Sequence, residues 1–262
     1  MHLPLANRWL ALVALALVVT LLPATIAAPT STAAAAEPTH PTDAFEAWFE
    51  VEQPPTAPFE AVQMVVDFPP GARVGRHTHG GPGYITMIAS ELTMWIGDAP
   101  GRTFQSGESF VELFKIVASG ANLSAEPSSV LVTYLLPVGA PVTTLEPSGP
   151  SATLASGASG TLPPGASPRF ESRLRLDSAP AHYRLGQMMR TYLPGAWTMS
   201  ELAPSPRLLT VVSGEVHILT GAAEQTYSAG ESWTELPGQA WLSGNLGNVP
   251  ALVAVSTDEM RP

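Results

Sequence analysis

An internal repeat is the feature that most constrains what this chain can fold into. At an offset of 123–124 residues, Gly107–Leu113 (GESFVEL) matches Gly230–Leu236 (GESWTEL), and an asparagine follows each block, at Asn122 and Asn245. Shorter matches at the same offset align Gln63-Met64 with Gln187-Met188, Pro70-Gly71 with Pro194-Gly195, Thr86 with Thr210 and Glu91 with Glu215. Two related units of about a hundred residues each therefore fit two domains of similar fold.

Both units have the composition of β-structure. Proline (27 residues) and glycine (22 residues) interrupt short runs of β-branched and aromatic residues, and long amphipathic helical patterns are scarce. This pattern is typical of an all-β architecture. The expected strands are Ala61–Phe68, Tyr84–Ile96, Ser109–Leu113 and Val130–Leu136 in the first unit, and Gly186–Leu193, Leu208–Leu219, Ser232–Leu236 and Ala251–Ser256 in the second. A short helix is expected near Asp43–Glu50.

Residues 1–36 are expected to form a secretory signal peptide. Arg8 precedes the apolar run Leu10–Leu22, which leads into small residues, so that cleavage after Ala28 or Ala36 fits the pattern. An uncleaved N-terminal anchor is the alternative, although the run is short for a bilayer span. In either case we expect an exported protein, secreted or extracytoplasmic, with no stable membrane span after signal cleavage.

Charge and composition exclude several classes of function. The formal net charge of −10 argues against nucleic-acid binding, which needs a basic footprint. The absence of cysteine excludes disulfides and thiolate nucleophiles. The sequence also has no Gly-x-Ser-x-Gly elbow, nucleotide-binding glycine loop or His-Glu-x-x-His motif.

A pair of histidines is the main candidate site. Residues 71–79 read GARVGRHTH, which places His77 and His79 two positions apart. In a strand, residues i and i+2 point to the same face, so both imidazoles can converge on one point. Neutral imidazole is the commonest metal ligand among side chains. The pair therefore marks a candidate metal site or ligand pocket.

These motifs resemble those of the cupin superfamily. The first cupin motif begins with a glycine, five residues and His-x-His, as Gly71, His77 and His79 do. The second motif runs from a glycine to an asparagine, as Gly107 to Asn122 do, and Gly230 to Asn245 frame it again in the second unit. The resemblance covers about residues 55–140 and 180–257. It implies two tandem jelly-roll (double-stranded β-helix) barrels, a bicupin.

The domain layout follows from the resemblance and the composition. Residues 37–54 are an N-terminal extension, and residues 55–145 are the N-terminal barrel. Residues 146–168, rich in proline, glycine, serine and alanine, are a linker. Residues 169–262 are a C-terminal barrel with a degenerate motif.

The resemblance implies a metal held by His, His, Glu and His, and this chain departs from that set. The glutamate position falls on Gly83 or Tyr84, and the last histidine position falls on Ala118. In the second unit, none of the four expected ligands remains at its position. The corresponding positions there are Glu201, Ala203, Arg207 and Trp241.

Two histidines alone would bind a metal weakly, because catalytic sites generally use three protein ligands. Further donors to consider are Tyr84, Glu91 and Glu112. However, Glu91 and Glu112 have counterparts in Glu215 and Glu235, in the unit without the histidines. That correspondence indicates structural roles for both glutamates.

The remaining candidates carry less chemistry. His217 stands alone in an expected strand, and His40 and His182 lie in loop-like sequence at the surface. Trp241, at a former histidine position, would fill much of the second barrel. That barrel is then a packed structural partner or, alternatively, a ligand site lined by Trp241 and Arg207.

Three functions remain open at this stage. The leading hypothesis is a non-catalytic small-molecule-binding protein, with its pocket formed by His77, His79 and Tyr84. The alternative is a metal-dependent, dioxygenase-like oxidoreductase with Fe, Mn, Ni or Zn on the two histidines. The third is a structural or envelope interaction protein. The sequence names neither the ligand nor the oligomeric state.

Overall fold

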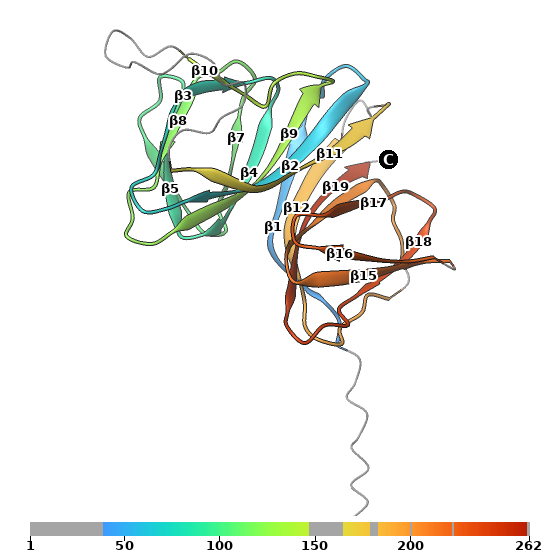
Figure 1. The fold of residues 1–262 in the computed structure, drawn as a ribbon. Helices are drawn as coiled ribbons and strands as arrows, with labels where there is room; N and C mark the ends of the chain where they lie inside the picture. Colours follow the sequence, from blue (N-terminus) through green and yellow to red (C-terminus); the bar gives the residue numbers. More distant parts are fainter. Residues whose placement is uncertain (1–38, 147–164, 179–182, 200, 222, 261–262) are drawn as a thin grey trace, which may run out of the picture. The chain divides into compact units, whose positions relative to one another are not determined.

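A computed structural model describes most of the chain beyond its N-terminal segment. Every described element is a β-strand (Figure 1). No helix among these residues is long and apolar enough to cross a membrane. The expected signal peptide and most of the expected linker lie outside the described residues. The described ranges are 39–146, 165–178, 183–199, 201–221 and 223–260.

The N-terminal barrel consists of two five-stranded antiparallel sheets. One sheet has the order β11(Ser167–Leu176)-β2(Phe59–Phe68)-β9(Ser128–Pro137)-β4(Gly83–Ala89)-β7(Ser109–Glu112). The other has the order β10(Thr143–Leu145)-β3(Arg73–His79)-β8(Ala118–Ala121)-β5(Glu91–Ile96)-β6(Arg102–Gln105). Their facing side chains form an apolar core that includes Met64, Ile85 and Val132. Apolar side chains thus fill most of the barrel interior.

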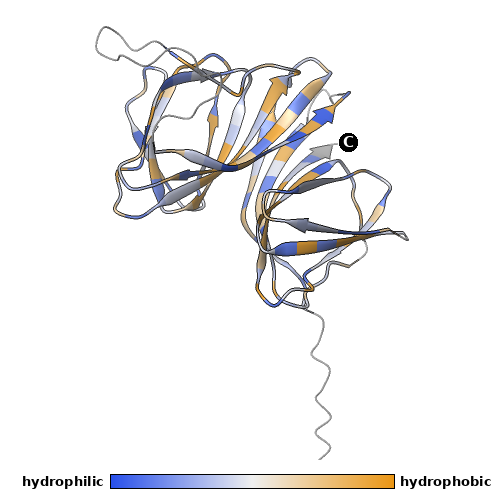
Figure 2. Ribbon diagram, in the orientation of Figure 1, coloured by the Kyte–Doolittle hydropathy of each residue, from blue (hydrophilic) through white to orange (hydrophobic). Residues whose placement is uncertain are grey.

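The C-terminal barrel repeats this arrangement. Its first sheet has the order β1(Thr42–Val51)-β12(Tyr183–Tyr192)-β19(Ala251–Met260)-β14(Arg207–Ser213)-β17(Ser232–Glu235). Its second sheet has the order β13(Glu201–Leu202)-β18(Ala240–Gly244)-β15(Glu215–Thr220)-β16(Ala223–Ser228). Along β15, hydrophobic and hydrophilic residues alternate, as in a strand with one buried face (Figure 2). Tyr192, Leu209 and Trp233 are buried in the core, and Trp241 packs against it.

The two barrels exchange their edge strands. β1, which precedes the first barrel in the chain, pairs with β12 of the second. β11, which begins within the expected linker, pairs with β2 of the first. The helix expected near Asp43–Glu50 is therefore wrong, because these residues form β1. The sheets also do not follow the expected domain boundaries at residues 55–145 and 169–262. β1 lies before the first range but pairs in the second barrel, and β11 lies mostly in the second range but pairs in the first barrel.

A left-handed residue divides each of the two longest expected strands. Tyr84–Ile96 forms β4 and β5, which belong to different sheets, and Ser90 between them has φ of 54°. Leu208–Leu219 divides in the same way at Gly214, with φ of 77°. A positive φ turns the chain sharply, so each segment passes from one sheet of its barrel to the other.

The five-stranded sheets that contain β2 and β12 face each other across a buried interface between the barrels. Apolar clusters there include Tyr84 packed with Leu185, and Val65 packed with Met189. Between them lies a polar network that contains side chains from both barrels. Its interactions are Gln63 Nε2 to Ser256 Oγ (2.8 Å), Gln187 Nε2 to Thr133 Oγ1 (2.7 Å) and Thr133 Oγ1 with Ser256 Oγ (2.8 Å).

The asparagines of the repeat have one structural role in both barrels. Asn122 Nδ2 donates to the carbonyls of Phe68 and Glu126, each at 2.8 Å. Asn245 donates in the same way to Tyr192 and Val249. Both asparagines are buried, and their hydrogen bonds satisfy loop carbonyls. This structural role explains why an asparagine follows the block in both units, although only the first unit has the His-x-His pair.

Candidate metal centre

His77 and His79 project from β3 into the N-terminal barrel. Each is about 4% exposed, and their ring centroids lie 4.8 Å apart with the ring planes at 79°. Both side chains line the same internal cavity. β10 covers the outer edge of β3, with Leu145 opposite His77 and Thr143 opposite His79. The histidines are therefore held by a strand that is paired on both sides.

A carboxylate from the opposite sheet completes a cluster with them. Glu112, at the end of β7, is 4% exposed, and its Oε2 lies 2.8 Å from His79 Nε2. Its Oε1 lies 4.0 Å from His77 Nε2. In the part of the chain that the structure describes, this is the one group of three or more His, Asp or Glu side chains that could hold a metal ion, and its ligand atoms all lie within 4.8 Å of one another.

The hydrogen bonds of the imidazoles fix where their protons lie. His77 Nδ1 is 2.7 Å from the carbonyl oxygen of Gly75, and His79 Nδ1 is 2.8 Å from that of Val142. A carbonyl can only accept, so each Nδ1 carries a proton and donates it. In the neutral tautomer each Nε2 then presents a lone pair to Glu112. Metal-bound histidines are oriented in this way by a hydrogen bond from the other ring nitrogen.

Three acceptors that face each other are suited to hold a positive charge between them. A second proton on His79 would satisfy its contact with Glu112. It would leave His77 Nε2 unsatisfied, because 4.0 Å is too long for a hydrogen bond. A divalent cation at the centre satisfies all three groups at once. The residues present therefore fit a metal ion with two nitrogen ligands and one oxygen ligand.

The pKa shifts agree with this donor set. Burial lowers the pKa of His77, and the nearby Glu112 carboxylate offsets that effect only in part. Burial alone would raise the pKa of Glu112, but the neighbouring imidazoles and the Tyr134 hydroxyl hold it below its usual value. Neutral imidazole and ionised carboxylate are the forms that bind a metal.

Tyr134 on β9 is the fourth polar group of the cluster. Its ring lies against His79, with centroids 4.5 Å apart. Its hydroxyl oxygen is 3.4 Å from Glu112 Oε2 and 3.5 Å from His79 Nε2. Burial and the Glu112 charge raise the pKa of Tyr134 well above its ordinary value, so the phenol keeps its proton. Tyr134 therefore faces the centre as a hydrogen-bond donor.

The strand register explains how Glu112 reaches this place. Gly83 on β4, the position where the resemblance implies a glutamate, lies directly opposite Glu112 on β7. It also lies directly opposite Tyr134 on β9. A Cβ atom at Gly83 would come within 2.4 Å of the Tyr134 ring. The glycine thus makes room for the tyrosine, and the carboxylate comes from the neighbouring strand.

The structure corrects the interpretation of the two glutamates. Glu112 has a counterpart, Glu235, at the same register position in the other barrel, yet it belongs to the histidine cluster. Glu91 lies outside that cluster and has the expected structural role, because its Oε2 accepts a hydrogen bond from Gln105 Nε2 at 2.7 Å. A repeat preserves the place of a residue in the fold, whereas its partners depend on the side chains around it.

The structure does not bring Tyr84 to the histidines. Tyr84 alternates with Ile85, which points into the barrel, and so faces the interface between the barrels. Its ring packs against Phe49 with a centroid distance of 5.3 Å. It lines a separate surface cavity of about 650 Å³ with Leu113 and Phe114. The aromatic hydroxyl of the cluster is that of Tyr134, which the sequence analysis did not single out.

The cavity beside the cluster is small and mostly apolar. Its volume is about 50 Å³, and Phe68, Leu92 and Phe110 are among the apolar side chains that line it. A water molecule in the liquid takes up about 30 Å³, so there is room for one or two ligands of that size. Pockets for drug-sized molecules are roughly 300–1,000 Å³. The space suits open coordination positions on a metal ion.

The other two described histidines lie apart from this centre. His217 Nδ1 contacts Thr226 Oγ1 at 3.0 Å in the second barrel. His40 is exposed, and its Nδ1 lies 3.2 Å from the carbonyl oxygen of Trp197. His182 lies outside the described residues. In the second barrel Arg207 takes the register position of Gly83 and forms an ion pair with Glu235.

Comparison with known proteins supports the fold. No family model and no curated protein matches the chain. A mutant of Bacillus subtilis oxalate decarboxylase has a TM-score of 0.50 and 15% identity, over 86% of this chain and 79% of that chain. AerE from Microcystis aeruginosa has a TM-score of 0.48 and 11% identity, over 85% and 98% of the two chains. A cupin 2 conserved barrel domain protein from Leptotrichia buccalis has a TM-score of 0.37 and 10% identity, with the same coverage. The chain has the expected all-β fold of two tandem jelly-roll barrels.

Proposed function

We propose that the N-terminal barrel binds one divalent metal ion through His77, His79 and Glu112, and that the protein is a metal-dependent, dioxygenase-like oxidoreductase. The observation that carries this proposal is the convergence of three buried acceptor atoms within 4.8 Å. Two histidines and one carboxylate with open positions are typical of non-haem iron oxygenases. Mn, Ni and Zn are further ions to test.

The chain's own residues have distinct roles in this proposal. A bound ion would supply a Lewis acid with open positions and, if redox-active, electron transfer. The Nδ1 hydrogen bonds orient His77 and His79, and Glu112 provides negative charge. The Tyr134 hydroxyl donates a hydrogen bond toward the centre. The apolar wall excludes bulk water, which strengthens these electrostatic interactions.

Non-catalytic binding of a small molecule beside the histidines is the second candidate function. The N-terminal barrel offers it about 50 Å³. A larger ligand would have to displace apolar side chains such as Phe110. The dense core therefore favours the metal-centred function over a pocket for an organic ligand at this place.

Metal content tests the proposal directly. Protein purified without chelators should contain about one metal ion per chain, and metal titration should give one site. His77→Ala/His79→Ala should abolish that site, and Glu112→Gln should weaken it more than tenfold, since one of three ligands is lost. Glu91→Gln is the matched control, because it removes a glutamate of the same barrel that has no part in the cluster. Sub-stoichiometric metal unaffected by these substitutions would contradict the proposal.

The enzymatic part needs a separate test of the open coordination positions. Co²⁺ bound to the apoprotein reports its ligands through visible absorption bands. Added azide should shift these bands if an exogenous ligand can reach the ion. A Co²⁺ spectrum that azide does not change would indicate a closed, structural site.

We also propose that the protein is exported, on the strength of its N-terminal sequence. Protein expressed with its full N-terminus should begin at Pro29 or Glu37 after processing. N-terminal sequencing of the extracytoplasmic fraction measures this. Recovery of the unprocessed chain from the cytoplasm would contradict it.

A further inference from the structure

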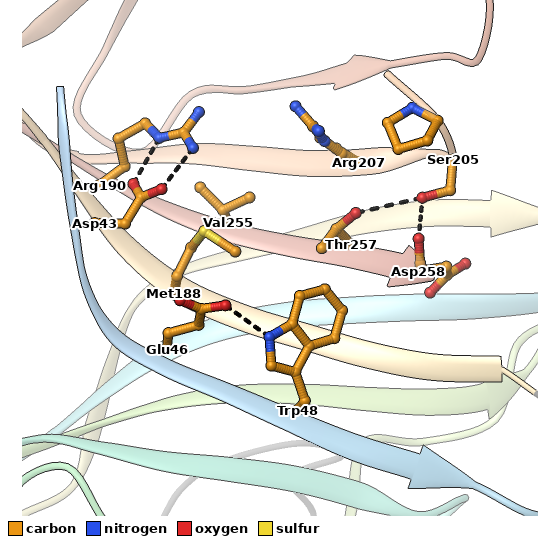
Figure 3. A pocket seen from close by; sticks show the side chains of 11 residues that line it. Asp43, Glu46, Trp48, Met188, Arg190, Ser205, Arg207, Val255, Thr257 and Asp258 are labelled. Carbon is orange, nitrogen blue, oxygen red and sulfur yellow. Dashed lines mark hydrogen bonds and ion pairs between the residues drawn. The ribbon is translucent and has the colours of Figure 1, made fainter. Parts of the chain in front are cut away.

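A cavity of about 490 Å³ lies at the first sheet of the C-terminal barrel, separate from the metal centre. Figure 3 shows the side chains that line it. They come from β1, β12, β14 and β19, and Ser205 comes from the segment before β14. This volume lies within the range of small-molecule pockets, which is roughly 300–1,000 Å³.

The strand register sets three of the lining residues, Trp48, Thr257 and Arg207, in one transverse row. The row crosses β1, β12, β19, β14 and β17, and its members are Trp48, Gly186, Thr257, Arg207 and Glu235. A Cβ atom at Gly186 would lie 2.7 Å from the Trp48 indole and 2.9 Å from Thr257 Cγ2. The glycine therefore lets the indole lie across the sheet beside Thr257.

The corresponding row of the N-terminal barrel explains why a cavity remains in the second. There, Tyr134, Gly83 and Glu112 occupy the positions of Thr257, Arg207 and Glu235. In the first barrel, the large ring of Tyr134 lies over Gly83, which has no side chain. In the second barrel, the short Thr257 stands at the tyrosine position and the long Arg207 at the glycine position. The space above Thr257 is left between the indole and the guanidinium.

Most of the charged groups around this cavity are already paired. Arg190 holds Asp43 through two hydrogen bonds of 2.7 Å. Glu46 accepts a hydrogen bond of 2.7 Å from Trp48 Nε1. These groups carry little unused hydrogen-bonding capacity toward a ligand.

Arg207 and Asp258 are the exceptions. Burial raises the pKa of Asp258 to about 7, so below that pH its carboxyl is protonated and does not repel an anion. The guanidinium of Arg207 has five N–H donors. Within the described residues its one ion-pair partner is Glu235, at 3.5 Å between Nη1 and Oε2. Glu235 also accepts a hydrogen bond of 3.3 Å from Trp233 Nε1. A partly buried cation with most donors unused, next to the Thr257 hydroxyl, is suited to bind an anionic oxygen pair.

We propose that this cavity binds a small organic carboxylate with an apolar body. The carboxylate would pair with Arg207 and accept from the Thr257 hydroxyl. The apolar body would contact the Trp48 indole, Met188 and Val255, which also line the cavity. The site uses the guanidinium of Arg207, at the register position that Gly83 has in the first barrel, so it needs no metal.

Binding of benzoate and phenylacetate tests the proposal. Isothermal titration calorimetry would use the full chain carrying His77→Ala/His79→Ala and treated with chelator, so that no carboxylate can bind at a metal ion. Both anions should bind with a Kd in the millimolar range or tighter. Neutral benzamide should bind more weakly, and benzylamine, of similar size and opposite charge, more weakly still.

Variants at Arg207 locate the site. Arg207→Gln should weaken benzoate binding roughly tenfold or more, since charge-assisted hydrogen bonds are lost, and Arg207→Lys should restore part of it. Arg207→Gln/Glu235→Gln removes the cation without leaving a buried carboxylate unpaired, which guards against misfolding. Arg102→Gln is the control, because it removes an exposed arginine of the other barrel.

Three results would overturn the proposal. The first is benzoate affinity that is equal in the Arg207→Gln/Glu235→Gln variant and in the parent. The second is tighter binding of benzylamine than of benzoate. The third is no detectable binding of either anion by a correctly folded protein. None of these outcomes bears on the metal content of the N-terminal barrel, so the two proposals fail independently.

Discussion

Gly83 lies directly opposite Glu112 in the antiparallel pair of β4 and β7. The resemblance to cupins puts a glutamate at Gly83, and this chain provides the carboxylate from the facing residue instead. Cross-strand neighbours have Cβ positions about 5 Å apart, so a long side chain on either strand can reach the same point. The carboxylate of the centre therefore comes from the strand next to β4, at the same register position.

Gly83→Ala should disturb the centre through Tyr134. The new Cβ would lie 2.4 Å from the ring, which must then move away from His79. We expect a loss of about 1–3 kcal/mol in the free energy of unfolding, as for overpacked cores, together with weaker metal binding. Urea unfolding and metal titration measure the two effects. Gly75→Ala, with nothing within 4 Å of its Cβ, is the matched control and should cause neither.

Tyr134→Phe should affect metal affinity more than folding. The ring that packs on His79 is kept, and only a donor 3.4 Å from Glu112 is removed. Loss of an outer hydrogen bond to a ligand lowers metal affinity by roughly tenfold or more. One metal site should still be found by titration, and Tyr227→Phe should leave its affinity unchanged. Complete loss of metal would instead make Tyr134 a ligand.

Gln187→Met should destabilise the interface between the barrels. The methionine has a similar size but leaves the carbonyl of Tyr84 and the hydroxyl of Thr86 without their partner, at 2.9 and 2.8 Å respectively in the native protein. Each unsatisfied buried group costs about 1–3 kcal/mol. Gln225→Met on the exposed face of β16 is the control. Equal urea midpoints for the two variants would refute the role of the network.

Asp258 should make stability depend on pH. Burial raises the pKa of Asp258 to about 7, compared with about 3.9 in an unfolded chain. Between these values the native state holds a proton that the unfolded state lacks, so this residue lowers stability as pH rises from about 4 to 7. Asp258→Asn should match the native protein at pH 5 and exceed it at pH 8 by on the order of 3 kcal/mol. Denaturant unfolding at both pH values measures this. The exposed Asp177→Asn should show no such difference.

The all-β class could be predicted from the sequence because the strand pattern is a local signal, and the two jelly-roll barrels followed from the resemblance of the repeated motifs. The first element of the fold could not be predicted. In β1 the ladder is irregular between Ala44 and Ala47, and Phe45 has φ of 55°. This irregularity breaks the two-residue alternation and leaves Phe45, Trp48 and Phe49 at the i, i+3, i+4 spacing of a helix.

The candidate site could likewise be predicted only in part. The His-x-His spacing identified two of its side chains, because both lie on one strand. Glu112 and Tyr134 come from β7 and β9, which become neighbours of β4 only through long-range pairing. Placing them needs the register of three strands, and the sequence alone does not specify that register.

The exchange of β1 and β11 has a consequence for dissecting this protein. A fragment that stops at residue 145 would leave β2 as an open edge, with its N–H and C=O groups free to recruit another chain. It would also lose the ion pair between Asp67 and Arg169. The shortest piece expected to keep the histidine centre in an intact sheet therefore extends to Leu176, so the two halves of the chain are not separable modules.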